Sequence, residues 1–189
     1  MKRSGIGLLV ASVLVPGCAS FYQQPGAGEK SAQLAARMPA EMAGFFREKS
    51  SLVEISGFAD AQCTPGAGKG RVLAFSSLKG VSENARVAAG RRLYLQIYRI
   101  ETGYKTLNAA QNALHALHKV PGKPTFEMEV TTKRCARVFS FEPEAGKSYE
   151  MLVGGDPRFC EASLADASTG TAPPDLQVHP VEGACIPKR

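Results

Sequence analysis

An alternation of apolar and polar residues with a period of two constrains the fold of this chain more than any other feature. The two clearest runs are residues 92–98 (RLYLQIY) and residues 125–131 (TFEMEVT). Successive side chains of a β-strand point to opposite faces, so each run can bury one face and expose the other. An amphipathic helix repeats its apolar residues every three or four positions instead, which neither run does. Both runs are therefore predicted to be strands with one face in a core.

Shorter stretches of the same alternation extend along most of the chain. They cover residues 53–56, 135–141, 149–153 and 160–164, and a weaker candidate covers residues 71–77. Roughly seven short strands separated by turn residues are typical of an antiparallel sandwich rather than of a parallel sheet. The predicted fold class is therefore mainly β, an antiparallel β-sandwich.

Two segments depart from this period and favour helix. In residues 40–49 the apolar side chains fall on one side of a helix, and Pro39 ends the segment before it. In residues 106–120 apolar residues recur at helical spacing until a Pro-Gly pair stops the run. We expect one short N-terminal helix and one short helical insert, within residues 104–120, that covers one end of the sandwich.

The N-terminus looks like an export signal. Lys2 and Arg3 precede an apolar run at residues 6–15, which is too short to span a bilayer. The following VPGC, which ends at Cys18, resembles the lipobox of bacterial lipoproteins, where a peptidase cuts before the cysteine and its thiol carries lipid. Ala19 is similar to the residue that follows this cysteine in lipoproteins sorted to the outer membrane. The resemblance implies lipidation at Cys18 and a place in the cell envelope, on the periplasmic face of the outer membrane.

The four cysteines that follow Cys18 indicate two disulfides. An even number of thiols in an exported chain is typical of disulfide bonding, and four cysteines allow three pairings. They are widely separated and form no CxxC pair, a spacing that does not suit zinc. Cys135 and Cys160 each share an alternating face with apolar neighbours, so we pair them and leave Cys63 with Cys185.

Composition divides the chain into four parts. Residues 1–17 form the predicted signal peptide, and the small, polar residues 18–33 form a lipidated flexible tether. The predicted sandwich domain spans residues 34–167, and a proline-rich, irregular tail follows over residues 168–189. This length suits one domain with its own core.

The charge argues against nucleic acid as a partner. The net charge of +6 is spread along the chain and forms no dense basic stripe. The expected partners are instead the membrane, through the lipid, and an envelope protein or polymer that the sequence does not identify.

The motifs that resemble catalytic signatures fail in their context. Ser76 and Lys79 match S-x-x-K, the nucleophile signature of penicillin-binding proteins, but there the serine opens a helix, whereas Ser76 ends a candidate strand. Residues 64–70 (TPGAGKG) lack the first glycine of a phosphate-binding loop, which Cys63 replaces, and its final hydroxyl. We therefore predict no enzyme, no catalytic residue and no cofactor, with an envelope hydrolase as the weakest alternative.

A binding role has two sets of candidate residues. His115 and His118 are three apart on the predicted insert and with His179 could form a copper or zinc site, but no carboxylate pattern supports it. No metal is therefore predicted. Tyr94 and Tyr98, together with the insert, are the residues of a speculative small-ligand site. A small-ligand or metal-binding carrier is the alternative function.

Two stretches resemble a loose group of small bacterial lipoproteins. One is residues 40–58, where a helix-like segment leads into VEISGF, and the other is residues 139–149 (FSFEPEAGKSY), followed by Cys160. The domain of these proteins looks like a transthyretin- or immunoglobulin-like sandwich, and the resemblance implies that fold while saying little about activity. The expected function is a membrane-anchored, non-enzymatic interaction or structural module of the envelope.

Overall fold

The computed structural model describes residues 21–39, 49–66, 69–77, 82–106, 128–155 and 160–185. Within these residues the elements are β1 (Ser31–Arg37), β2 (Lys49–Phe58), β3 (Gly70–Ser76), β4 (Ser82–Ala88), β5 (Leu93–Thr106), β6 (Met128–Phe141), β7 (Ser148–Gly154), β8 (Glu161–Asp166), β9 (Gln177–His179) and the 3₁₀ turn η2 (Gly183–Cys185). The predicted N-terminal helix and helical insert lie outside the described residues, apart from Lys49, which begins β2, and residues 104–106, which end β5. No helix in the described part of the chain is long and apolar enough to cross a membrane.

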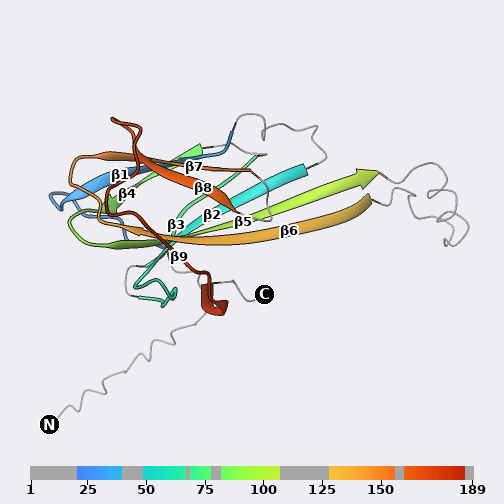
Figure 1. Ribbon diagram of the computed structural model, residues 1–189, viewed down its shortest axis with the longest axis horizontal. Helices are drawn as coiled ribbons and strands as arrows, with labels where there is room; N and C mark the ends of the chain where they lie inside the picture. The colour runs from blue at the N-terminus through green and yellow to red at the C-terminus, as the bar shows by residue number, and fades with distance from the viewer. Residues whose placement is uncertain are drawn as a thin grey trace, which may run out of the picture.

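The strands form two sheets that lie one above the other (Figure 1). One sheet has the order β4-β1-β7-β8 and the other the order β3-β2-β5-β6-β9, so the prediction of a mainly β protein is confirmed. The described neighbours pair antiparallel except β1 and β7, which run parallel with Leu34 opposite Tyr149. The antiparallel prediction is wrong at this pair, because an alternating pattern identifies a strand but not its direction.

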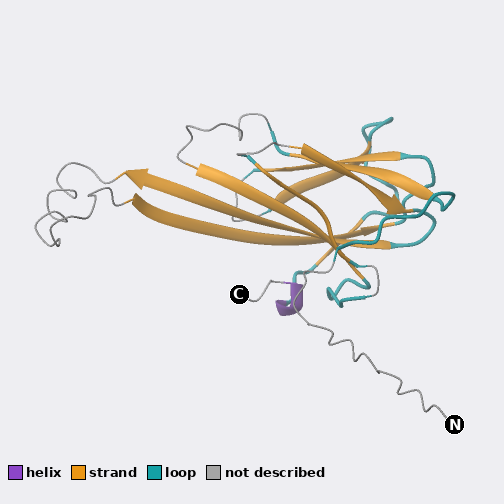
Figure 2. Ribbon diagram, turned by 180° about the vertical axis from the view of Figure 1, so that it is seen from behind, coloured by secondary structure: helices purple, strands orange, loops and turns teal. Residues whose placement is uncertain are grey.

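One apolar core lies between the two layers that Figure 2 shows from behind. Inward residues alternate along each strand, as the period of two predicts. Fully buried side chains come from both layers: Leu34, Val87 and Met151 from the four-stranded sheet, and Ile55 and Phe141 from the five-stranded sheet. Burying one such side chain stabilises the fold by about 1.5–3 kcal/mol, so contact between the sheets is the main source of stability.

The sequence analysis did not predict two of the core strands, β1 and β4. In β1, Ala32, Leu34 and Ala36 are all buried. From the sequence alone, a single leucine among alanines is typical of a tether or of a weak helix and does not indicate a strand. These small residues are buried because β1 lies inside its sheet, between β4 and β7. In β4 just two residues, Ala85 and Val87, are buried, and a pair is too short to identify a strand.

Residues 22–33, predicted as part of a flexible tether, are fixed to the domain. Tyr22 is buried, its N–H donates to the Arg71 carbonyl (3.0 Å), and its hydroxyl accepts a hydrogen bond from the Ala88 N–H (3.0 Å). Residues 31–33 already belong to β1. The tether prediction is wrong from Tyr22 onward, because one buried aromatic ring outweighs the polar composition around it.

The strands β5 and β6 are the longest and run past the rest of the molecule (Figure 1). We call their paired residues 101–106 and 128–133 the β5–β6 ribbon. Val130 lies in this ribbon and is 55% exposed, so its predicted burial is wrong. Val130 lies on the same face of β6 as Val138, and this face points away from the inter-sheet core that Phe139 and Phe141 enter, so the four-stranded sheet does not cover Val130.

A buried arginine joins the two sheets where the ribbon leaves the core. Arg99 of β5 is 1% exposed, and its Nη1 donates to the carbonyls of Gly154 (2.9 Å) and Gly155 (3.0 Å) at the end of β7. Its Nη2 donates to Glu101 Oε2 at 2.9 Å. A buried guanidinium is tolerated only with such partners, because losing its hydration is costly.

The two disulfides are the two predicted pairs. Cys135 lies directly opposite Arg99 in the β5–β6 register and is bonded to Cys160, just before β8, so this bond also joins the two sheets. We call Arg99, its two carbonyl partners and the Cys135–Cys160 bond the inter-sheet clamp. The Cys63–Cys185 bond ties the loop after β2 to η2. Part of the tail predicted to be irregular is strand β9, which pairs with β6.

We expect Arg99→Ala to lower the free energy of unfolding by about 3–5 kcal/mol, because it removes the buried opposite charge and hydrogen bond that Arg99 gives Glu101, together with its hydrogen bonds to Gly154 and Gly155. Urea denaturation measures this loss, and the exposed Arg134→Ala should change stability by less than about 0.5 kcal/mol. The double change Arg99→Met with Glu101→Gln should recover most of the loss, since no buried charge is then left alone. Equal stability of the single and double variants would contradict the proposed role of the ion pair.

Candidate functional site

Three connections between the two sheets meet at the end of the domain opposite the ribbon. They are residues 89–92 between β4 and β5, residues 142–147 between β6 and β7, and residues 167–176 between β8 and β9. Together with Lys30 they line a cavity of about 590 Å³, a volume within the range of small-molecule sites. We call it the loop-end cavity.

Charged side chains of both signs line this cavity. The cations are Lys30, Arg92 and Lys147, and the acids are Glu142, Glu144, Asp166 and Asp175. Pro143, Pro173 and Tyr149 are also part of the wall and are buried, so they add rigid apolar surface. A few polar groups on a stiff apolar frame are what orients a ligand in a binding site.

Two glycine turns bring these loops together. Gly90 and Gly146 have φ angles of 75° and 80°, in the left-handed region that residues with a Cβ rarely adopt. The Gly90 N–H donates to the Pro143 carbonyl (2.8 Å), which joins the first connection to the second. The Gly146 N–H donates to the Ser31 carbonyl (2.8 Å), which fixes the second connection to the start of β1. The loops are therefore held by backbone hydrogen bonds.

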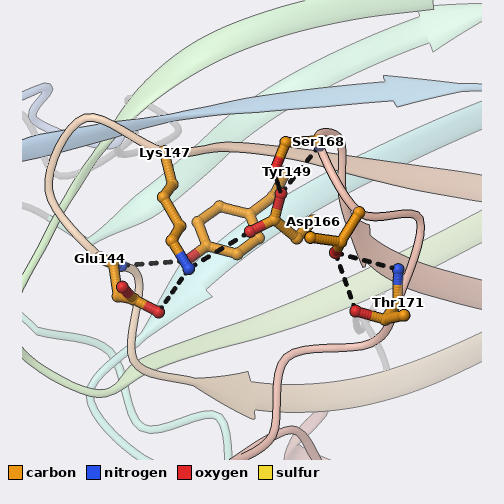
Figure 3. A network of polar contacts seen from close by, with 7 residues as sticks. Glu144, Lys147, Tyr149, Asp166, Ser168 and Thr171 are labelled. Atoms are coloured by element: carbon orange, nitrogen blue, oxygen red, sulfur yellow. Dashed lines mark hydrogen bonds and ion pairs between the residues drawn. The ribbon is translucent and has the colours of Figure 1, made fainter.

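Lys147 and Asp166 form an ion pair in the cavity wall (Figure 3). The Lys147 Nζ lies 2.7 Å from Glu144 Oε1 and 3.4 Å from Asp166 Oδ2. Asp166 Oδ1 accepts hydrogen bonds from the Ser168 hydroxyl (2.6 Å) and N–H (2.8 Å). The Ser168 hydrogen bonds, with a smaller contribution from Lys147, hold the pKa of Asp166 below its usual 3.8. The hydrogen bond to Glu144 raises the pKa of Lys147, so both groups are charged at neutral pH.

Tyr149 connects this network to the core. Its hydroxyl accepts a hydrogen bond from the Glu144 N–H (3.0 Å), and its ring meets Phe141 edge-on with centroids 5.0 Å apart. Both rings are buried. In Figure 3 the Tyr149 ring lies beside the Lys147 and Asp166 side chains. Tyr149 therefore links this polar network to the apolar core.

Two charged side chains of the cavity lining are unengaged by other described residues. Arg92 Nη2 donates to Asp175 Oδ2 (3.0 Å), which also accepts a hydrogen bond from the Glu142 N–H (2.8 Å). The side chains of Lys30 and Glu142 are exposed and make no hydrogen bond or ion pair with another described residue. The loop-end cavity thus offers one cation and one anion that a ligand can bind without breaking an existing pair.

Of the four residues predicted for a binding site, the structure describes two, Tyr94 and Tyr98. Cys18, His115 and His118 lie outside the described residues. Tyr94 and Tyr98 are half-buried on the outer face of β5, and neither lines the loop-end cavity. Within the described ranges, no three His, Cys, Asp or Glu side chains are grouped so that they could hold a metal ion.

Ser140 and His179 form a hydrogen bond that the sequence did not predict. The Ser140 Oγ lies 2.7 Å from His179 Nε2. Ser140 is fully buried, and its hydroxyl also accepts a hydrogen bond from Arg92 Nη1 (3.1 Å). A nucleophilic serine must be open to its substrate, so we assign this pair a structural role in joining β9 to β6. The two residues lie on different strands, and no local motif connects them.

The chain matches no protein-family model, no curated protein and no solved structure. The function of the cavity must therefore be inferred from its own geometry. That geometry combines a suitable volume, a charged lining and two unengaged side chains.

We expect Asp166→Asn to destabilise the domain near neutral pH and to matter less in acid. The native carboxyl has a lowered pKa, so its contribution is complete above its unfolded pKa and is lost as pH falls through the native value. The free energy of unfolding, measured at about pH 7 and about pH 2, should differ from that of the parent only at the higher pH. Glu182→Gln, an exposed side chain without a partner among the described residues, is the control. A loss that is the same at both pH values would contradict this assignment.

Proposed function

We propose that the chain is a lipid-anchored, non-enzymatic binding module of the bacterial cell envelope. In this proposal Cys18 carries the lipid, the two-sheet domain is a transthyretin- or immunoglobulin-like sandwich, and the loop-end cavity takes the ligand. The location that Ala19 favours is the periplasmic face of the outer membrane. The ligand is a segment of an envelope protein or a fragment of an envelope polymer.

The disulfides support export. Cys63–Cys185 and Cys135–Cys160 pair all four cysteines that follow Cys18. Disulfides form and persist outside the reducing cytosol. Two bonds therefore agree with the compartment that the N-terminal signal predicts, although they do not identify the anchor.

One observation carries the binding part of the proposal, the pair of unengaged charges at the loop-end cavity. Lys30 and Glu142 line the same cavity and are free of partners among the described residues. The neighbouring charges of Lys147 and Asp166 neutralise each other. A ligand that carries both an amino and a carboxyl group would complement the two free residues, and short peptides and peptide-bearing polymers have both groups.

The serines with catalytic resemblance favour a non-enzymatic role. Ser140 is buried beside His179, as described above. Ser76 is the last residue of β3, as predicted, and Lys79 lies outside the described residues. The S-x-x-K reaction needs the lysine one helical turn after the serine. A strand end does not provide that arrangement, so a hydrolase remains the weakest alternative.

A small-ligand carrier is the second candidate, and the cavity volume of about 590 Å³ favours it. The site would then be the loop-end cavity rather than the outer face with Tyr94 and Tyr98. The two candidates differ in what binds. A carrier of neutral ligands does not depend on the charges of Lys30 and Glu142, whereas the proposed module does.

We expect Cys18→Ser to abolish incorporation of labelled palmitate and to release the protein from the membrane fraction, because the thiol is the proposed site of acylation. Cells that express the full chain provide the measurement. Cys63→Ser is the matched control, since it removes a different thiol and should keep the label. Labelling of the Cys18→Ser protein at the level of the parent would contradict the anchor.

We expect soluble peptidoglycan fragments, whose stem peptides carry amino and carboxyl groups, to shift the NMR signals of Lys30, Glu142 and the loop at residues 167–176. The double reversal Lys30→Glu with Glu142→Lys should weaken this binding by about three- to tenfold, because two exposed contacts become repulsive. Arg91→Glu, an exposed cation of the same end that does not line the cavity, should leave the affinity unchanged. Shifts confined to residues outside the cavity would contradict the proposed site.

A further inference from the structure

Strand β6 has one edge along which the described strands pair with only a short stretch. On one side it pairs with β5 along its whole length, from Met128 to Phe141. On the other side β9 covers only Val138, Phe139 and Ser140. No described strand pairs with residues 128–137 on that side, which leaves an open edge about 33 Å long. We call it the β6 edge.

An open edge presents unpaired backbone N–H and C=O groups at every second residue, so it can accept a further strand. The side chains of Val130, Thr131 and Thr132 are exposed along the β6 edge. Threonine and valine favour extended backbone and pack well against a neighbouring strand. The β6 edge therefore has the composition of a strand that is ready to pair.

The inter-sheet clamp holds this edge in place. Cys135 lies within it, is bonded to Cys160, and stands opposite Arg99. The edge is therefore attached to a rigid part of the core and does not have to order itself on binding. Preorganisation of this kind lowers the entropic cost of association.

Charge indicates the kind of strand that fits. The β6 edge contains three cations, Lys133, Arg134 and Arg137, and one acidic residue, Glu129. Two copies paired along these residues would bring cations close to cations, and the net charge of +6 adds to the repulsion between copies. An acidic strand has the complementary charge, and opposite charges directly across two strands stabilise the pairing.

We propose that the β6 edge is a β-augmentation site for an extended acidic segment of a partner protein. The segment adds a strand beside residues 128–137, its backbone supplies the hydrogen bonds, and carboxylates on its alternate residues lie on the same face of the sheet as Arg134. This site lies at the end of the domain away from the loop-end cavity and does not depend on the function proposed for that cavity.

The test uses the disulfide-bonded protein and an eight-residue probe peptide in which glutamate alternates with valine or threonine. We expect the probe to bind and to slow amide hydrogen exchange in residues 130–134. Arg134→Glu should weaken binding by about tenfold, because one cross-strand attraction becomes a repulsion. Arg91→Glu is the control, since Arg91 is an equally exposed arginine near the other end of the domain and its reversal should leave the affinity unchanged.

One further probe separates strand addition from simple charge attraction. A probe with alternate backbone amides methylated keeps its carboxylates but cannot pair, so it should not bind. Equal binding of the methylated probe would overturn the proposal. Absence of binding by the unmodified probe would overturn it as well and would leave Lys133 and Arg134 as charges that keep the edge free of partners.

The free protein provides the last check. Sedimentation should show a monomer, and the edge amides should exchange rapidly before the probe is added. A dimer that the Arg134→Glu change affects would assign the edge to a second copy instead. Slow exchange in the free monomer would mean that the edge is already occupied by the chain itself, and either result would overturn the proposal.

Discussion

The burial of Arg99 between the two sheets is the interaction on which the rest of the structure depends. A guanidinium in an apolar core is stable only where its charge and hydrogen bonds are met, and here Gly154, Gly155 and Glu101 meet them. Its Nε is buried without a partner among the described residues. Losing one of the hydrogen bonds of its terminal nitrogens would therefore leave a second buried donor unpaired. A shift of β5 by one residue would turn Arg99 toward the outer face. We infer that Arg99 fixes the register of one sheet over the other.

The clamp also separates two ends of different chemistry. On one side of Arg99 the strands carry apolar inward residues, and the connections between sheets close over the core at the loop-end cavity. On the other side β5 and β6 continue without the four-stranded sheet above them. At the loop-end cavity, the ion pairs of Lys147 pack beside Tyr149. At the ribbon, β6 has backbone groups on one edge that pair with no other described strand. A ligand with charged groups suits the cavity, and an extended chain suits the edge.

The sequence allowed prediction of those parts of the fold that depend on local pattern. The inward face of β5 is read directly from the alternation at residues 93–97, the Cys135–Cys160 bond from cysteines that share apolar faces, and the Cys63–Cys185 bond from the two cysteines that remain. Arg99 and Glu101 continue that inward face, and two opposite charges in such positions were a detectable sign of a buried pair. The strand β1 was missed because its buried residues are mostly alanine. Burial there is decided by its neighbours in the sheet and not by its own hydrophobicity.

The site was less accessible to prediction than the fold. Its walls come from three connections that are far apart in the chain, and only the sheet order brings them to one end. The glycines of the two turns, Gly90 and Gly146, are visible in the sequence, but whether such a turn joins two strands of one sheet or of different sheets is not, and here each joins different sheets. The open side of β6 was equally hidden, because it depends on how little of β6 the short strand β9 covers.

The buried position of Tyr22 gives the proposed anchor a geometric consequence. Phe21 forms an isolated parallel β-bridge with Arg71, near the start of β3. This part of β3 lies at the end of the domain where β5 begins and where the loop-end cavity is found. If Cys18 is acylated, only two residues lie between it and Phe21, and the three Cα–Cα steps that join them span at most about 10 Å. The end with the loop-end cavity would then face the membrane closely, instead of standing away from it on a long tether. The β5–β6 ribbon, at the other end of the same strands, would point away from the membrane, where a partner protein can reach the β6 edge.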